Sequence, residues 1–203
     1  MVARRMALAA GVPVVALSLQ LDPDYRTSYA LLEQGEHYAI YDAGVKAYPA
    51  TTFLVQTSFE PIDLGADMQP FMDTTRLRQF IEANDIPVKA DGPAEVYLYN
   101  WVDGAQGAMV FDVGVVVEDH IGDVPRGDGF VVKRYPAMKF ASLVYEGPFP
   151  HEPESGWDRI RWEDRAKARG HVYTEQLYRE LYHRYDYAGT ARRHVTEIQI
   201  EIH

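Results

Sequence analysis

Strand-like alternation of apolar and polar residues dominates the chain from residue 37 to its end. Runs rich in β-branched and aromatic residues, whose side chains alternate between the two faces of a strand, predict β-structure. Gly44, Pro49 and a glycine-containing turn at 103–107 interrupt these runs. The predicted strands cover residues 37–62, a strand pair over 95–119, and residues 130–149, 174–185 and 194–202.

Helical spacing of apolar residues occurs in the stretch 67–85, where they recur every three to four positions. A second helix is predicted over 155–170, SGWDRIRWEDRAKARG. Its Ser155 and Asp158 have the spacing of a capping box, which satisfies two backbone N–H groups at a helix start. The two helices therefore follow the first and the third predicted strand regions.

A repeated phrase divides the chain into two units. VKAYPATTFLVQTSFEPI (45–62) and VKRYPAMKFASLVYEGPF (132–149) share seven of eighteen positions. Because the order helix, strand, strand follows each phrase, the sequence favours an α+β fold of two β-α-β-β units, repeat one over about 37–120 and repeat two over about 128–203. We expect a pseudo-twofold relation between the units, antiparallel sheets, helices on one side and a central ligand cleft.

The first 36 residues differ from the rest of the chain. Arg4 and Arg5 precede an apolar run, which is the layout of a secretory signal or a membrane anchor. We therefore expect an exported or membrane-anchored protein, with membrane association through residues 6–21; a cytoplasmic protein is the alternative. A buried strand or helix at the edge of the domain would also explain this run. Residues 22–36 are polar with little periodicity and predict a connector.

Composition narrows the classes of partner and of chemistry. The 203 residues carry 30 acidic and 20 basic side chains, and the formal net charge of −10 disfavours direct binding of nucleic acid. The absence of cysteine excludes disulfides and thiolate nucleophiles. The seven histidines do not have metal-ligand spacing. We expect no metal and no other cofactor, and a small-molecule ligand as the partner of a monomer or homodimer.

A carboxylate between aromatic rings is predicted on equivalent strands of both units. Glu95 and Glu180 lie 85 positions apart, each followed two residues later by a tyrosine. The opposite, apolar face of each strand is expected to pack on the helices, which leaves the carboxylate face for the cleft. Such a face suits an amphipathic cation, because rings supply cation–π attraction and the carboxylate a charged hydrogen bond. The residues that share these faces are Glu95, Tyr97, Tyr99 and Trp101 on one strand, and Tyr178, Glu180 and Tyr182 on the other.

Four phrases, in a fixed order, carry a resemblance to a known family: KRYPAMKFASLVYEGPF, WDRIRWEDRAKARG, YRELY and VTEIQIEI. Over about residues 40–203 the chain resembles the GyrI-like (SbmC-type) small-molecule-binding domain, the effector-binding domain of multidrug-responsive transcription regulators. The resemblance implies that Glu180 contacts cationic drugs and that Trp162 corresponds to the family's helix tryptophan. Tyr145 is a further candidate for the ligand-binding site. About 36 residues precede the match, which favours a stand-alone binding module without a DNA-binding domain.

Two other functions fit the same pattern. Some stand-alone GyrI-like proteins hydrolyse strained cyclopropane-type genotoxic small molecules, and Glu180 would then act as the general acid or base with Tyr145 or Tyr97 as a second polar group. The haem-binding SOUL family opens with a strand similar to VKAYPA and VKRYPA. Its methionine-threonine-proline phrase is missing from this chain. Binding of a small molecule is the leading hypothesis, and hydrolysis is the alternative.

Overall fold

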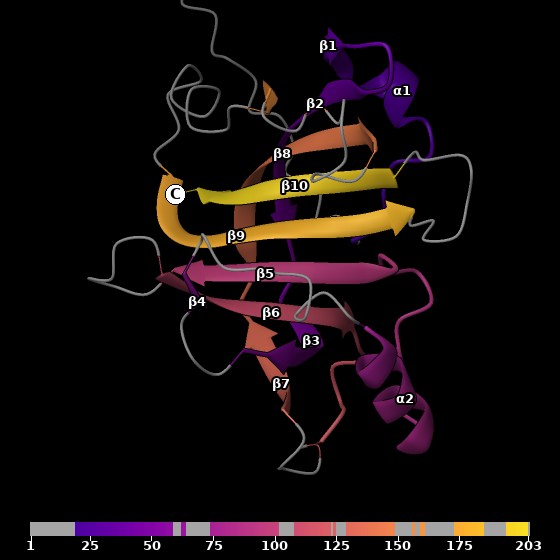
Figure 1. Cartoon of the computed structure of the whole chain (residues 1–203), viewed down its shortest axis with the longest axis vertical. Helices are drawn as coiled ribbons and strands as arrows, with labels where there is room; N and C mark the ends of the chain where they lie inside the picture. Colours follow the sequence, from indigo (N-terminus) through magenta and orange to yellow (C-terminus); the bar gives the residue numbers. More distant parts are fainter. Residues whose placement is uncertain are drawn as a thin grey trace, which may run out of the picture.

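Ten antiparallel strands form one sheet in the computed structural model of the chain (Figure 1). Along the sheet the strand order is β1-β2-β8-β10-β9-β5-β6-β3-β7, and β4 also pairs with β6. The structure describes residues 19–58, 62–63, 74–101, 108–122, 124, 129–148, 156, 159–160, 173–184 and 194–202.

The elements within the described residues are two helices and ten strands. The helices are α1 (Tyr25–Ser28) and α2 (Thr75–Ala83). The strands are β1 (Ala30–Gln34), β2 (Ala39–Tyr48), β3 (Thr51–Thr57), β4 (Ile62–Asp63), β5 (Glu95–Trp101), β6 (Ala108–Val116), β7 (Phe130–Tyr135), β8 (Met138–Gly147), β9 (Tyr173–Arg184) and β10 (His194–Ile202). The strand regions predicted from the alternating pattern are thereby confirmed, and the fold is α+β with few helices.

Each copy of the repeated phrase forms two strands that separate at its proline. Proline has no N–H for the strand ladder, and accordingly β2 ends before Pro49 and β7 ends before Pro136. The four strands then pair across the two copies. β2 lies beside β8, and β3 lies beside β7. Segments about ninety residues apart are therefore joined by direct hydrogen-bond ladders, one toward each end of the strand order.

Gly44 marks an irregularity within β2. Its φ is 72°, a left-handed conformation that costs glycine little and a β-branched or bulky residue much more. The backbone N–H of Gly44 donates to the Asp42 carboxylate at 2.8 Å, and the register between β2 and β8 shifts between these two residues. The local bulge explains why the sequence has glycine in an otherwise strand-like run.

The main hydrophobic core lies on one face of the sheet. The sheet is curved, so side chains of its central strands pack on this face against side chains of strands further out. Val96, Leu98 and Leu181 from the central strands contact aromatic residues from strands further out, among them Phe53 and Phe140. Figure 1 shows how this occurs, since β8 curves behind β10 and β9. No residue of α2 belongs to this core, so the expectation that this apolar face packs on the helices is wrong for α2, while most of the second predicted helix lies outside the described residues. The curl of the sheet brings strands of both units onto the same face instead.

Helix α2 packs on the opposite face of the sheet, the face that carries Glu95. Its Leu77 and Phe80 lie one turn apart and contact Leu54, Val115 and Phe130. The observed helix is shorter than the predicted stretch 67–85, of which residues 67–73 lie outside the described residues. Most of the second predicted helix, 155–170, also lies outside them.

Residues 22–36, for which the sequence predicts a connector, contain α1 and β1. Among the described strands β1 pairs with β2 alone, and its side chains are largely exposed without alternation of burial. Tyr25 is buried and donates a hydrogen bond to Glu146 at 2.9 Å. Leu19 joins the main core.

Residues 1–18, which hold most of the expected signal or anchor, lie outside the described part of the chain. Within that part, neither helix has the length and hydrophobicity needed to cross a bilayer.

Candidate ligand-binding site

The two strands that carry the predicted site residues lie side by side. β5 and β9 pair in antiparallel register with Tyr97 opposite Glu180 and Glu95 opposite Tyr182. Directly opposite residues point to the same face of a sheet, so the carboxylates and tyrosines of both units come together. The tyrosine rings also touch across the strands, with ring centroids 4.9 Å apart for Tyr97 and Tyr182.

Glu180 lies in the middle of this group and is surrounded by tyrosine hydroxyls. Tyr178 donates to its Oε1 and Tyr182 to its Oε2, each at 3.0 Å, and Tyr99 is a third hydrogen-bond donor. The residue is 5% exposed. Burial raises the pKa of Glu180 from 4.5 to about 7, because the hydroxyls offset only part of the cost of desolvating its charge. No cationic side chain among the described residues pairs with it.

Glu95 occupies the equivalent position on β5 but has its own cation. Arg78, at the start of α2, places Nη2 2.6 Å from Glu95 Oε1. The Thr74 hydroxyl donates to the same oxygen at 2.9 Å, and the Tyr97 hydroxyl donates to Oε2 at 3.0 Å. A buried carboxylate with an arginine and two hydroxyls has its charge compensated within the chain. The sequence pattern does not indicate Arg78 as a partner of Glu95, since the contact depends on where α2 packs.

The tyrosines around Glu180 remain protonated donors over the physiological pH range. Burial raises the pKa of Tyr99 and of Tyr182 well above 10, and the neighbouring Glu180 carboxylate raises both further. These hydroxyls can therefore hold a carboxylate but cannot supply a positive charge to it. The arrangement can accept a cation, or it can keep a protonated Glu180 as a hydrogen-bond donor.

The three other predicted site residues do not join the group around Glu180 in the described structure. Tyr145 is fully buried in a cluster against which Tyr178 packs, and its hydroxyl donates to the Pro148 carbonyl at 2.8 Å. Trp101 is the last residue of β5, but its side chain is not described, and Trp162 lies outside the described residues. The structure thus brings together the residues Glu95, Tyr97, Tyr99, Tyr178, Glu180 and Tyr182.

A second polar group lies on the opposite face of the sheet, around Glu197. Lys46 places its Nζ 2.9 Å from Glu197 Oε1, and the hydroxyl of Tyr48 donates to that oxygen at 2.8 Å. Burial alone would raise the pKa of Glu197, but His183 and Lys46 hold it below its ordinary value. We interpret this group as structural, because its charges are paired within the core.

Arg179, also on that face, is fully buried. Its guanidinium lies over the Phe140 ring, 3.8 Å from the centroid, and over Tyr48 at 4.7 Å. Burial lowers its pKa from 12.5 to about 10. Within the described residues, no group of three histidine, aspartate or glutamate side chains has the arrangement needed to hold a metal ion.

Comparisons with known proteins give matches among solved structures. No protein-family profile and no curated protein sequence matches the chain. The crystal structure of the EcmrR C-terminal domain matches with a TM-score of 0.57 at 12% identity, over 82% of this chain and 98% of that domain. SAV2435 bound to tetraphenylphosphonium matches with a TM-score of 0.50 at 16% identity, over 78% of this chain and 92% of SAV2435.

EcmrR in its complex with DNA, determined by cryo-electron microscopy, also matches. The TM-score is 0.60 at 15% identity, and the match covers 81% of this chain. It covers 57% of EcmrR, so this chain corresponds to little more than half of that protein. At sequence identities this low, the structural similarity is evidence for the fold alone. The expected resemblance to the GyrI-like effector-binding domains is confirmed at that level, and the chain has their fold.

Proposed function

We propose that this chain binds amphipathic cationic small molecules at Glu180. One observation carries the proposal: Glu180 is a buried carboxylate held by three tyrosine hydroxyls, with a pKa near 7 and no cation among the described residues. The fold supports it, since the chain resembles an effector-binding domain, and SAV2435 has been solved with tetraphenylphosphonium, a hydrophobic cation.

The energetics favour a cation with an apolar body. Folding has already removed Glu180 from water, so an arriving cation does not have to desolvate the carboxylate again. A charge-assisted contact to a buried partner contributes about 1.5–3 kcal/mol. The rings of Tyr99, Tyr178 and Tyr182 add apolar area and cation–π attraction of about 0.5–2 kcal/mol each where the geometry allows.

We also infer that the two units are related by a pseudo-twofold axis between β5 and β9. The strand order on one side of this pair, β9-β10-β8-β2, corresponds to β5-β6-β3-β7 on the other. The ion pair of Lys46 with Glu197 has a counterpart in Lys133 with Asp112, at 2.5 Å. The site at Glu180 would then lie close to the axis, where residues from both units meet. Superposition of the units in an experimental structure tests this arrangement.

The experiment for the proposed function compares two isosteric variants of equivalent residues. Tetraphenylphosphonium and the uncharged triphenylphosphine oxide are titrated into the wild-type protein, Glu180→Gln and Glu95→Gln, with calorimetry as the readout. Glu180→Gln is expected to weaken binding of the cation about ten- to a hundredfold, the loss of one charge-assisted contact. Binding of the neutral compound is expected to change less than threefold.

Glu95→Gln is the matched control, because it removes a buried carboxylate from the same face of the sheet. We expect affinity for the cation to stay within about twofold of wild type in this variant, since Glu95 is compensated by Arg78. Equal losses in both variants, or an equal loss for both compounds in Glu180→Gln, would contradict the assignment of Glu180 as the cation-binding carboxylate.

A further inference from the structure

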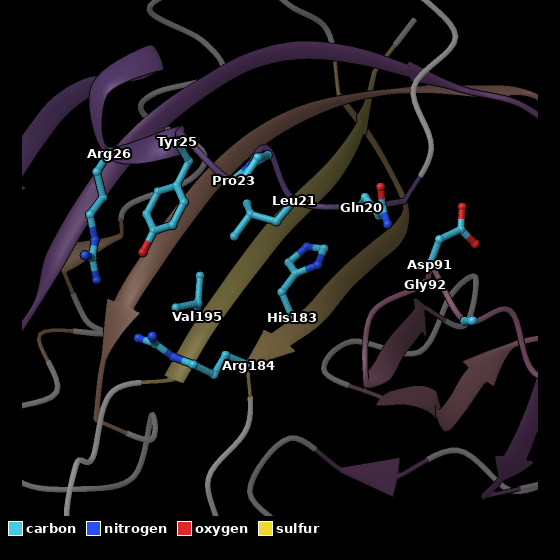
Figure 2. A pocket seen from close by; sticks show the side chains of 11 residues that line it. Gln20, Leu21, Pro23, Tyr25, Arg26, Asp91, Gly92, His183, Arg184 and Val195 are labelled. Carbon is cyan, nitrogen blue, oxygen red and sulfur yellow. The ribbon is translucent and has the colours of Figure 1, made fainter.

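A pocket of about 560 Å³ lies on the face of β9 opposite to Glu180, between the segment 20–26 and the loop 90–92 (Figure 2). His183 lines it, and because His183 is three residues after Glu180 on the same strand, their side chains point to opposite faces. The volume is within the range of pockets that hold small molecules. The pocket is thus a possible binding site separate from the candidate site at Glu180.

A β-bulge in β9 sets the position of His183 at this pocket. The ladder between β9 and β10 shifts register between Val195 and Thr196, so that His183 is an extra residue of β9 without a partner of its own in β10. Bulges of this kind re-aim side chains and are frequent next to functional sites. Figure 2 shows the imidazole rising from β9 toward Leu21 of the N-terminal segment. The bulge therefore delivers one particular side chain of β9 to the pocket.

The equivalent place in the first unit has neither the bulge nor a histidine. Leu98 lies 85 positions before His183, the same spacing as between Glu95 and Glu180. β5 pairs with β6 around Leu98 without a register shift, and the leucine is fully buried in the main hydrophobic core. A leucine therefore fills the packing role at this place of the fold. The histidine and its bulge are features that packing alone does not require.

The buried Glu197 carboxylate orients the imidazole of His183, whose side chain is 8% exposed. His183 Nε2 lies 3.6 Å from Glu197 Oε2, beyond hydrogen-bond distance, and neither atom has a hydrogen-bond partner among the described residues. His183 and Lys46 hold the pKa of Glu197 below its ordinary value, so Glu197 is ionised and can only accept. The proton of the neutral imidazole therefore lies on Nε2, toward the carboxylate, and Nδ1 has a lone pair. His183 thus has a hydrogen-bond acceptor, Nδ1, to offer a ligand in the pocket.

The charged residues that line the pocket disfavour a ligand with a net charge. Arg26 and Arg184 lie at one end, and Asp91 lies at the other end (Figure 2). A cation that fills the pocket would meet the two guanidinium groups. An anion would meet Asp91, and also the ionised Glu197 next to His183. A neutral ligand avoids like charges at both ends.

We propose that this pocket binds a small neutral phenol. Its ring lies over Leu21, Pro23 and Val195, which belong to the apolar part of the lining, and its hydroxyl donates to Nδ1 of His183. A phenolic hydroxyl stays protonated at neutral pH, so it is a donor without a charge. The proposal is independent of the proposed function at Glu180, because no residue assigned to that site lines this pocket.

Three probes that share one aromatic ring test the hydrogen bond and the charge. They are 4-ethylphenol, 4-ethylanisole, which lacks the donor, and 4-ethylbenzylamine, which has donors and a positive charge. Each is titrated into protein with ¹⁵N-labelled histidine, and the shifts of the His183 ring signals give the dissociation constants at this pocket. The phenol is expected to bind about three- to tenfold more tightly than the anisole, the gain of one hydrogen bond, and about tenfold more tightly than the amine. Burial of apolar area alone would favour the anisole over the phenol, because the methyl ether has the larger apolar surface.

Variants assign the contact to His183. His183→Phe keeps a ring and removes the acceptor, so in calorimetry the affinity for 4-ethylphenol should fall to that for 4-ethylanisole, and its spectrum identifies the His183 signals in the wild type. Lys46 keeps Glu197 paired in this variant, which should therefore fold. Ala90→Trp, at an exposed residue that lines the pocket, leaves His183 in place and should abolish binding of both probes by filling the pocket. Glu180→Gln should leave binding of 4-ethylphenol unchanged.

The proposal is overturned if 4-ethylphenol does not bind, if 4-ethylanisole or 4-ethylbenzylamine binds as tightly, or if Ala90→Trp binds the phenol as the wild type does. Binding that leaves the His183 signals in place, or that moves Nε2 and not Nδ1, would also overturn it. Loss of phenol binding in Glu180→Gln would move the ligand to the other face of the sheet, with the same consequence. Failure of tetraphenylphosphonium to bind, by contrast, bears only on the proposed function at Glu180.

Discussion

Glu95 and Glu180 begin from the same local pattern and have different surroundings. Each is buried, each lies on a central strand of the sheet, and each accepts a hydrogen bond from a tyrosine two residues further along the strand. Glu95 is paired with Arg78 of α2. Among the described residues Glu180 has tyrosine hydroxyls but no cation as partners, and its pKa rises to about 7. The charge of Glu95 is balanced within the chain, whereas the charge of Glu180 has no cationic partner among the described residues.

A strand pattern specifies which residues share a face of the sheet but not what covers that face. A single arginine, contributed by a helix seventeen positions earlier in the chain, separates a structural carboxylate from a candidate binding carboxylate. The difference can be tested by removing the charge of each glutamate, its partner cation, or the hydroxyls that hold it.

The largest expected effect is an opposite change of stability in the two glutamine variants. Ionising Glu180 costs the folded state about 3 kcal/mol, which corresponds to the rise of its pKa from 4.5 to about 7. Because the folded pKa is raised, stability is full below about pH 4.5 and falls as the pH rises through 7. At pH 8 Glu180→Gln should therefore be more stable than wild type by up to about 3 kcal/mol.

Glu95→Gln should instead be less stable at pH 8 by about 1–2 kcal/mol, since it weakens a paired and hydrogen-bonded carboxylate. Urea denaturation at pH 5 and pH 8 measures both changes. Changes of the same sign in the two variants would remove the distinction between the two carboxylates.

The next effect is on the pH dependence of cation binding. A cation pairs with ionised Glu180, so its affinity should be constant above about pH 8 and fall roughly tenfold for each pH unit below 6. Binding at pH 6 should release close to one proton, which calorimetry in buffers of different ionisation enthalpy detects. In Glu180→Gln both the pH dependence and the proton release should disappear. A flat profile in the wild type would show that Glu180 does not pair with the cation.

Removing the partner of Glu95 should have a smaller effect. Arg78→Ala leaves a buried carboxylate without its cation, but the arginine side chain is 61% exposed and partly screened by solvent. We therefore expect a loss of about 1–2 kcal/mol in the free energy of unfolding at pH 8. Gln79→Ala, at an exposed position of the same helix, is the control and should cost less than half as much. A loss no larger than that control would mean that Arg78 does not compensate Glu95.

The smallest effect is expected from removing one hydroxyl. Tyr182→Phe deletes one of the donors to Glu180, which should raise the pKa of that carboxyl further above 7 and weaken cation binding at pH 7 about two- to tenfold. Tyr97→Phe, which deletes a donor to Glu95, is the matched variant and should leave cation binding unchanged. If Tyr97→Phe weakens binding as much as Tyr182→Phe, packing of the rings rather than the hydroxyl is responsible.

The sequence was sufficient to predict the strands and the carboxylate faces, because alternation along a strand is a local property. Tyr178, Glu180 and Tyr182 lie on one face for that reason alone. The pairing of β5 with β9, which brings Glu95 and Glu180 together, was not predicted, because alternation along a strand does not say which strands are neighbours. The helix of the first unit was also predicted in position, although not in length.

Tertiary contacts explain the parts that the sequence could not predict. The side of the sheet on which α2 packs decides whether Arg78 reaches Glu95, and no periodicity carries that information. β1 was missed because an exposed edge strand lacks alternating burial. The contact of Tyr25 with Glu146 joins residues 121 positions apart, and the pocket beside it depends on that docking. The polar segment 22–36 has no sequence pattern that would predict the contact of Tyr25 with Glu146 or the pocket.

The crossed pairing of β2 with β8 and of β7 with β3 has a consequence for how such a chain can be shortened. Each unit contributes a strand that completes the other unit's part of the sheet. A gene that kept only one unit would encode a sheet with an unpaired, hydrophobic edge, which invites aggregation. Formation of the native sheet also requires distant segments to meet, which slows folding relative to local pairing. Either half of the chain alone is therefore not expected to form a stable sheet.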